Sequence, residues 1–165
     1  TKLPFDAHLM ILSPGLWATR YVDAGCESVA IHVEAPDQHR ATLDAIRDSG
    51  GRAGLALDPE TPIESLVPFR DELDFALVMT VKSGFGGQSY RPEAAARMAA
   101  IRALVGERDG HPLPLHVDGG ISATTAGDAA AAGADLLVVG SALFSAQGPA
   151  GMGGAVRAIR ESATR

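Results

Sequence analysis

Six short apolar segments alternate with helix-like segments along the whole chain, and this order constrains the fold more than any other feature. Each apolar segment has the length of a buried parallel strand and ends in a polar turn. The six segments are Leu3–Met10, Ser28–Val33, Ala53–Leu57, Phe75–Val81, Leu113–Val117 and Leu136–Val139. Strict alternation of strand and helix predicts a parallel sheet covered by helices, either an open doubly wound sheet or a barrel.

Helix punctuation supports this order. Thr61, Pro62 and Glu64 supply a cap, a proline in the first turn and an acid in the capping-box position, which strongly indicates a helix there. The glycine-rich stretch from Gly148 to Gly154 favours a surface loop. The other expected helices are Ser13 to Gly25, Gln38–Asp48, Pro92–Arg108, Ser122 to Gly133 and Ala155–Ser162, with a short helical turn beginning near Ser141.

Size and charge bound the class of protein. A chain of 165 residues with a net charge of -6 fits one globular domain over residues 1–165. Its 14 basic residues are scattered, which argues against nucleic-acid binding. No segment has the length and apolarity of a membrane span or a signal peptide, so we expect a cytoplasmic protein. We expect Cys26, Trp17 and His116 to be packed in the interior.

Polar side chains gather where the apolar segments end. Functional residues of parallel α/β proteins lie at the carboxyl ends of strands. The alternation of a strand puts Asp6, His8 and Met10 on one face, and His32 and Glu34 follow from the second segment. Asp118 ends the fifth. The pattern therefore predicts two imidazoles and three carboxylates at one edge of the sheet, with His32 and Glu34 as a buried polar pair that orients other groups.

Glycine-rich corners follow the last three apolar segments. Glycine lets backbone amides approach an anion closely. The corners are Gly84–Gln88, Asp118–Ile121 and Gly140–Phe144. Small residues after the last two strands are typical of the phosphate site of barrels, and this favours a barrel over an open sheet.

Together these strings resemble the ribulose-phosphate 3-epimerase family. They read DAHLM at 6–10, HVE at 32–34, GFGGQ at 84–88, VDGGI at 117–121 and GSALF at 140–144. The resemblance implies a TIM (β/α)₈-type barrel that interconverts D-ribulose 5-phosphate and D-xylulose 5-phosphate in the pentose phosphate pathway. It also implies a divalent metal, Zn²⁺ first and Fe²⁺, Mn²⁺ or Co²⁺ as alternatives, that stabilises an enediolate.

The resemblance assigns a role to each matching residue. Asp118 would be a catalytic acid/base, and His8 and Asp118 would be metal ligands. Met10 and Met79 would cover the reacting carbons. The substrate-binding residues would be His8, Gly84, Phe85, Gly86, Gly87, Gly119, Gly120, Gly140 and Ser141.

The chain departs from the family in two respects. The family has two further strands before the first one found here, and they carry a second acid/base carboxylate and two more metal ligands. We therefore expect six βα units, little epimerase activity and open sheet edges that favour a homo-oligomer. Ser83 stands where the family commonly has proline, which bears on the rigidity of the loop. A noncatalytic sugar-phosphate-binding fragment and a hexulose-phosphate 3-epimerase remain the alternatives.

Overall fold

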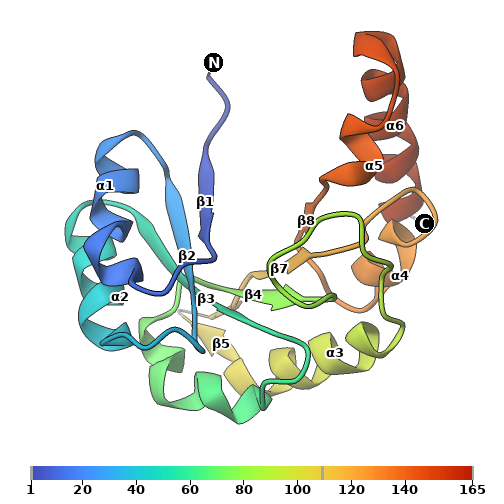
Figure 1. The fold of residues 1–165 in the computed structure, drawn as a ribbon. Helices are drawn as coiled ribbons and strands as arrows, with labels where there is room; N and C mark the ends of the chain where they lie inside the picture. Colours follow the sequence, from blue (N-terminus) through green and yellow to red (C-terminus); the bar gives the residue numbers. More distant parts are fainter. Residues whose placement is uncertain (1, 109, 165) are drawn as a thin grey trace.

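A curved sheet of six parallel strands, wrapped by helices on its outer side, organises the chain (Figure 1). The computed structural model describes residues 2–108 and 110–164. The strand order is β1-β2-β3-β4-β7-β8, so neighbours in the chain are neighbours in the sheet. The strands are β1 (Asp6–Leu9), β2 (Ser28–His32), β3 (Arg52–Leu57), β4 (Phe75–Met79), β7 (Leu115–Asp118) and β8 (Leu136–Val138). All six predicted strands are confirmed, although β1 is shorter than expected at both ends.

The sheet is curled as in a barrel. His8 of β1 and Asp118 of β7 are four strand positions apart, which in a flat sheet would separate them by roughly 19 Å at about 4.8 Å per strand. Their side chains instead lie 3.1 Å apart. In the described part of the chain β1 and β8 have no further strand beside them, so the sheet is a partial barrel with two open edges. The barrel-type expectation is confirmed over the open doubly wound sheet.

Alternation along the strands divides the core in two. Side chains on the outer face, such as Val29, Leu55 and Val78, pack under the helices in the larger cluster. A smaller inner cluster centres on Phe75, which needs small neighbours: a Cβ on Gly54 would lie 2.4 Å from the Phe75 ring. His116 is buried among these inner residues with its ring 4.2 Å from that of Phe75, centroid to centroid, as predicted.

The helices follow the predicted order with three corrections. The helical segments are η1 (Pro14–Leu16), α1 (Ala18–Asp23), α2 (His39–Asp48), η2 (Ile63–Glu72), α3 (Glu93–Val105), α4 (Ala126–Ala131), α5 (Ser141–Phe144) and α6 (Gly148–Ala163). The segment after Pro62 is a 3₁₀ helix, because Pro68 lies inside it and Thr61 bonds Glu34 rather than capping it. The expected surface loop at Gly148–Gly154 is the first part of α6. A small antiparallel pair, β5 (Glu107–Arg108) and β6 (His111–Pro112), replaces the end of the helix predicted to Arg108.

Trp17 and Cys26 are both less buried than predicted. Trp17, expected in the core, is 47% exposed, and the Arg20 guanidinium lies 5.0 Å from the centre of its ring. Cys26 is only half-buried. Among the described residues no helix is both long and apolar enough to cross a bilayer.

Candidate active site

The carboxyl ends of β1 and β7 bring His8 and Asp118 together. His8 Nδ1 lies 3.1 Å from Asp118 Oδ2, and the two side chains are 15% and 22% exposed. Both groups therefore stay reachable from solvent while most of their surface is enclosed. The predicted convergence of this histidine and this carboxylate on one rim is confirmed.

A cavity of about 240 Å³ opens beside Asp118 and gathers all three glycine corners. Met10 and Met79 form part of its apolar wall, and Phe85 at its rim is 84% exposed. The remaining lining residues are Val81, Gly84, Gly86, Gly87, Gln88, Gly119, Gly120, Ile121, Val138, Gly140 and Ser141. A larger cavity of about 750 Å³ lies beside α3 and shares Met79 with the first one, but none of the glycine corners lines it.

The corner after β7 requires glycine. Gly119 and Gly120 have φ of +121° and +60°, in the range that side chains disfavour. A Cβ on Gly120 would lie 2.3 Å from the backbone nitrogen of Tyr90, so the corner packs directly on the loop after β4. Thr125 Oγ1 donates to the Gly120 carbonyl at 2.9 Å, and Thr80 Oγ1 donates to the Gly119 carbonyl. These contacts hold two of the glycine corners in a fixed relation.

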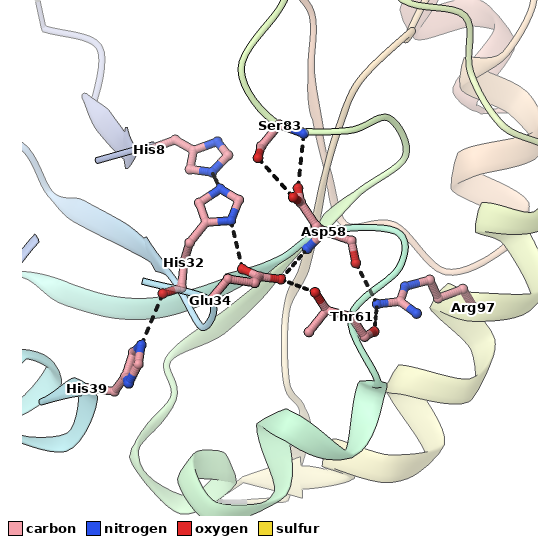
Figure 2. A network of polar contacts seen from close by, with 8 residues as sticks. All are labelled: His8, His32, Glu34, His39, Asp58, Thr61, Ser83 and Arg97. Carbon is pink, nitrogen blue, oxygen red and sulfur yellow. Dashed lines mark hydrogen bonds and ion pairs between the residues drawn. The ribbon is translucent and has the colours of Figure 1, made fainter. Parts of the chain in front are cut away.

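A chain of polar contacts continues from His8 to the next two strands (Figure 2). His8 Nε2 lies 2.9 Å from His32 Nε2, and His32 Nδ1 lies 3.0 Å from Glu34 Oε2. Burial by itself raises the pKa of Glu34, but hydrogen bonds from His32, Thr61 and the Asp58 backbone outweigh it and hold that pKa at about 2. Glu34 is therefore ionised at neutral pH.

Asp6 does not join this cluster, which corrects the prediction of three converging carboxylates. It is the first residue of β1 and accepts a hydrogen bond from Ser28 Oγ, at the first residue of β2. Two residues of extended chain separate it from His8 by roughly 6.6 Å along the strand. The two-residue period of the strand predicted the correct face for Asp6, but it does not predict the residue at which the strand begins.

Sequence reasoning missed the residues that fix the surrounding loops. Asp58 follows β3 directly and accepts hydrogen bonds from Ser83 N and Ser83 Oγ, both at 3.0 Å. Arg97 of α3 donates to the Asp58 carbonyl at 2.9 Å and also to that of Thr61. The rule that strand ends carry function could have found Asp58, since it ends the third apolar segment. Nothing local in the sequence marks Arg97.

His8 and Asp118 fit two ligands of a divalent ion. Ligands about 2.0–2.2 Å from zinc at neighbouring corners of a tetrahedron are roughly 3.4 Å apart, close to the observed 3.1 Å between Nδ1 and Oδ2. Among the described residues no group of three or more His, Cys, Asp or Glu side chains is placed to hold a metal. The pair alone would supply two ligands to such an ion.

The fold and the cavity define a class of protein. The structure resembles 3-hexulose-6-phosphate synthase from Salmonella typhimurium, with a TM-score of 0.73 at 20% identity over 98% of this chain and 73% of that one. It also resembles orotidine 5'-phosphate decarboxylase from Pyrococcus horikoshii, with a TM-score of 0.72 at 22% identity over 100% of this chain and 76% of that one. These likenesses define the fold: a parallel α/β protein of the barrel type.

The sequence comparisons give the family. The model of the ribulose-phosphate 3 epimerase family matches residues 1–144. Proteins named ribulose-phosphate 3-epimerase are 40% identical over 99% of this chain in Mycobacterium bovis and 38% identical over 86% of it in Escherichia coli. The chain spans 69% and 62% of the length of those two relatives. The chain belongs to the ribulose-phosphate 3-epimerase family.

Proposed function

We propose that this chain carries the sugar-phosphate site and one acid/base group of a ribulose-phosphate 3-epimerase, which interconverts D-ribulose 5-phosphate and D-xylulose 5-phosphate in the pentose phosphate pathway. One observation carries the proposal: a single cavity joins three glycine corners to Asp118 and, through it, to His8. The proposed substrate is inferred from relatives named ribulose-phosphate 3-epimerase, which are 38–40% identical to this chain.

The glycine corners are the proposed phosphate site. The cavity holds no lysine or arginine among the described residues that line it, so an anion there would be bound by backbone N–H groups. Glycines 84, 86, 87, 119, 120 and 140 leave the backbone open to such contact. Ser141 adds a hydroxyl. Met10 and Met79 would then pack against the carbon chain of the sugar.

Asp118 is the proposed acid/base. It is the one ionisable side chain among the described residues lining the cavity. A carboxylate beside C3 removes a proton and returns it on the same face, whereas inversion needs a second group on the opposite face. The chain by itself should therefore exchange the C3 proton with solvent but form little of the epimer.

His8 and Asp118 are the proposed protein ligands of a divalent metal, Zn²⁺ first and Fe²⁺, Mn²⁺ or Co²⁺ as alternatives. Such an ion supplies positive charge to an oxyanion that develops next to the carbon losing its proton. A catalytic zinc has three protein ligands as a rule. Two ligands from the described residues would hold the ion only weakly.

An exchange experiment tests this proposal. The purified chain is incubated with D-ribulose 5-phosphate and Zn²⁺ in D₂O, and C3 is followed by NMR. We expect deuterium at C3 with little xylulose 5-phosphate, and no deuterium with Asp118→Asn. Rapid formation of xylulose 5-phosphate would contradict the single-carboxylate argument. Absence of both exchange and sugar-phosphate binding would overturn the proposal.

A noncatalytic sugar-phosphate binder is the second candidate. It is favoured by the contrast between a complete set of glycine corners and a partial set of charged groups. Isothermal titration with ribulose 5-phosphate separates the two candidates. Binding without deuterium exchange would support the binder, and binding with exchange would support the enzyme.

We further propose that the chain works in the cytoplasm as a homo-oligomer. Within the described residues, β1 and β8 each have a side with no neighbouring strand, and such edges favour pairing with another chain. A phosphorylated sugar substrate and a single cysteine fit a reducing compartment. Cell fractionation tests the location, and the oligomeric state is taken up below.

A further inference from the structure

The side chains of His32 and Glu34 link the candidate metal ligand His8 to the loop after β3 (Figure 2). The rings of His8 and His32 are nearly coplanar, at 12°, with centroids 5.0 Å apart. Their Nε2 atoms are much closer, at 2.9 Å, so the rings meet edge to edge through one hydrogen bond. One of the two nitrogens must donate and the other accept.

Glu34 decides which one donates. Its Oε1 accepts hydrogen bonds from the Asp58 backbone N–H at 2.8 Å and from Thr61 Oγ1. Its Oε2 faces His32 Nδ1 at 3.0 Å. An ionised carboxylate only accepts, so His32 Nδ1 carries the proton. A neutral His32 then has its lone pair on Nε2.

The direction of this hydrogen bond determines which nitrogen of His8 donates. Because His32 Nε2 accepts, His8 Nε2 must donate, and its Nδ1 is the ring nitrogen that faces Asp118 Oδ2 at 3.1 Å. Asp118 Oδ2 is also an acceptor, so a cation, or a proton in its absence, lies between these two atoms. We propose that Glu34 and His32 are positioning residues that hold a proton on His8 Nε2, so that Nδ1 is the nitrogen that binds a cation beside Asp118. The link to metal binding rests on the proposed function, whereas the tautomer itself does not.

Arg97 stabilises the loop whose donors orient the Glu34 carboxylate. Arg97 of α3 donates to the carbonyls of Asp58 and Thr61, the two residues whose donors fix Oε1. Both donors therefore stay aimed at the same oxygen. Outer groups of this kind set the orientation and tautomer of ligating histidines in metal sites, and their loss lowers metal affinity about 10- to 100-fold.

Glu34→Gln should reverse the whole relay. The donors of Asp58 and Thr61 require an acceptor at the Oε1 position, so the amide NH₂ of glutamine must occupy the position that faces His32 Nδ1. The NH₂ donates, His32 becomes protonated on Nε2, and His8 must accept through its Nε2. The proton of His8 then moves to Nδ1, where it occupies the ion-facing nitrogen.

Nuclear magnetic resonance of the chain labelled with ¹⁵N-histidine tests the relay without metal or substrate. The coupling pattern of each ring identifies its protonated nitrogen. We expect a proton on Nδ1 but not on Nε2 of His32, together with a proton on Nε2 of His8, in the wild type. In Glu34→Gln the proton of His32 should move to Nε2, and His8 should lose the proton on Nε2. Glu60→Gln is the matched control, because it removes the same charge from the same loop, where Glu60 forms an ion pair with Arg91 and makes no hydrogen bond or ion pair with His8, His32 or Glu34 among the described residues. An Nε2–H on wild-type His32 would overturn the proposal.

Zinc competition against a chromophoric chelator supplies the second readout. We expect Glu34→Gln to weaken Zn²⁺ binding about 10- to 100-fold and Glu60→Gln to leave it unchanged. Equal affinities in wild type and Glu34→Gln would overturn the link to the metal. If the wild type binds no zinc, the proposed metal site fails while the tautomer is still decided by the spectra. Deuterium exchange at C3 decides the proposed reaction separately.

Discussion

Gly120 is the residue whose replacement should most directly separate the corner after β7 from the proposed phosphate cavity. A left-handed conformation costs a non-glycine residue about 1–2 kcal/mol, and a Cβ here would also meet Tyr90 N at 2.3 Å. Gly120→Ala should therefore push the 88–90 segment away, lower the melting temperature by several degrees and weaken ribulose 5-phosphate binding at least tenfold. Thermal unfolding and isothermal titration measure the two effects.

Gly86→Ala is the control for this prediction. Gly86 lines the same cavity, yet a Cβ there meets nothing within 4 Å. Its melting temperature should match that of the wild type. If both alanine variants melt alike, the close approach of the corner to Tyr90 does not limit stability, and the prediction is wrong.

Single residues were predicted well where one local rule decides their position. His8 and Asp118 lie near the carboxyl ends of their strands, and these ends lie at one edge of a parallel sheet, so the sequence predicts that the two residues share an edge. Their contact at 3.1 Å also requires the curvature of the sheet. The role of His32 was predicted only in outline, because its partner His8 lies on the neighbouring strand β1 and the contact depends on the register between β1 and β2. Asp6 was placed wrongly because its position depends on where β1 begins, and Trp17 because it lies in the turn between η1 and α1 and not on a helix face.

At the level of elements, the loop after β4 is held by a clamp from the loop after β3. Ser83 donates both its backbone N–H and its hydroxyl to Asp58, where proline, common in the family, would lack both donors. The Gln88 amide adds bonds to the Lys82 and Phe85 carbonyls. Ser83 lacks the conformational restriction of a proline ring, and its hydrogen bonds to Asp58 restrain the loop in place of that ring.

Ser83→Ala should loosen this loop without unfolding the protein. The variant keeps the backbone bond and loses the hydroxyl bond, worth about 1 kcal/mol. We expect faster amide hydrogen exchange in residues 84–88 and a several-fold weaker affinity for ribulose 5-phosphate, measured by mass spectrometry and titration. Ser49→Ala, which removes an exposed hydroxyl bond at the end of α2, should change neither. Unchanged exchange in 84–88 would show that the backbone bond alone holds the loop.

Elements whose stability comes from tertiary packing were the ones that sequence patterns misassigned. Four glycines lie in α6, and each costs up to about 1 kcal/mol relative to alanine in a helix interior. The helix nevertheless forms because it packs closely on α4, where a Cβ on Gly127 would lie 3.0 Å from the Ser162 carbonyl oxygen. Helix propensity depends on the local sequence alone, so it cannot predict a contact with another helix. The 3₁₀ form of η2 was foreseeable from Pro68, which removes a backbone donor inside the predicted helix.

For the whole molecule, strand order and helix order were predictable, whereas curvature was suggested only by the glycine corners. Alternating strands and helices are compatible with a flat and a curled sheet, because each unit contacts only its neighbours. Glycine corners after the last strands favoured the curled form, and the His8–Asp118 contact across four strand positions bears this out. The curled sheet leaves a cavity of about 270 Å³ on its inner side, between β1 and β8.

The edges beside that cavity give the prediction for the assembled molecule. Backbone groups at the free sides of β1 and β8 are unpaired within the described chain, and half-buried side chains such as Leu136 line the space between them. Pairing with a second copy would satisfy the backbone groups and cover Leu136. We therefore expect the sedimentation coefficient to rise with protein concentration over the micromolar range.

A charge that points inward from an edge strand opposes such pairing, because the second chain would bury it. Leu136→Lys should therefore sediment as a monomer at concentrations where the wild type associates. Val67→Lys, on the outer side in η2 at a residue already 41% exposed, should associate as the wild type does. Circular dichroism melting of both variants checks that each is folded. A wild-type chain that stays monomeric throughout, or two lysine variants that behave alike, would rule out association through these edges.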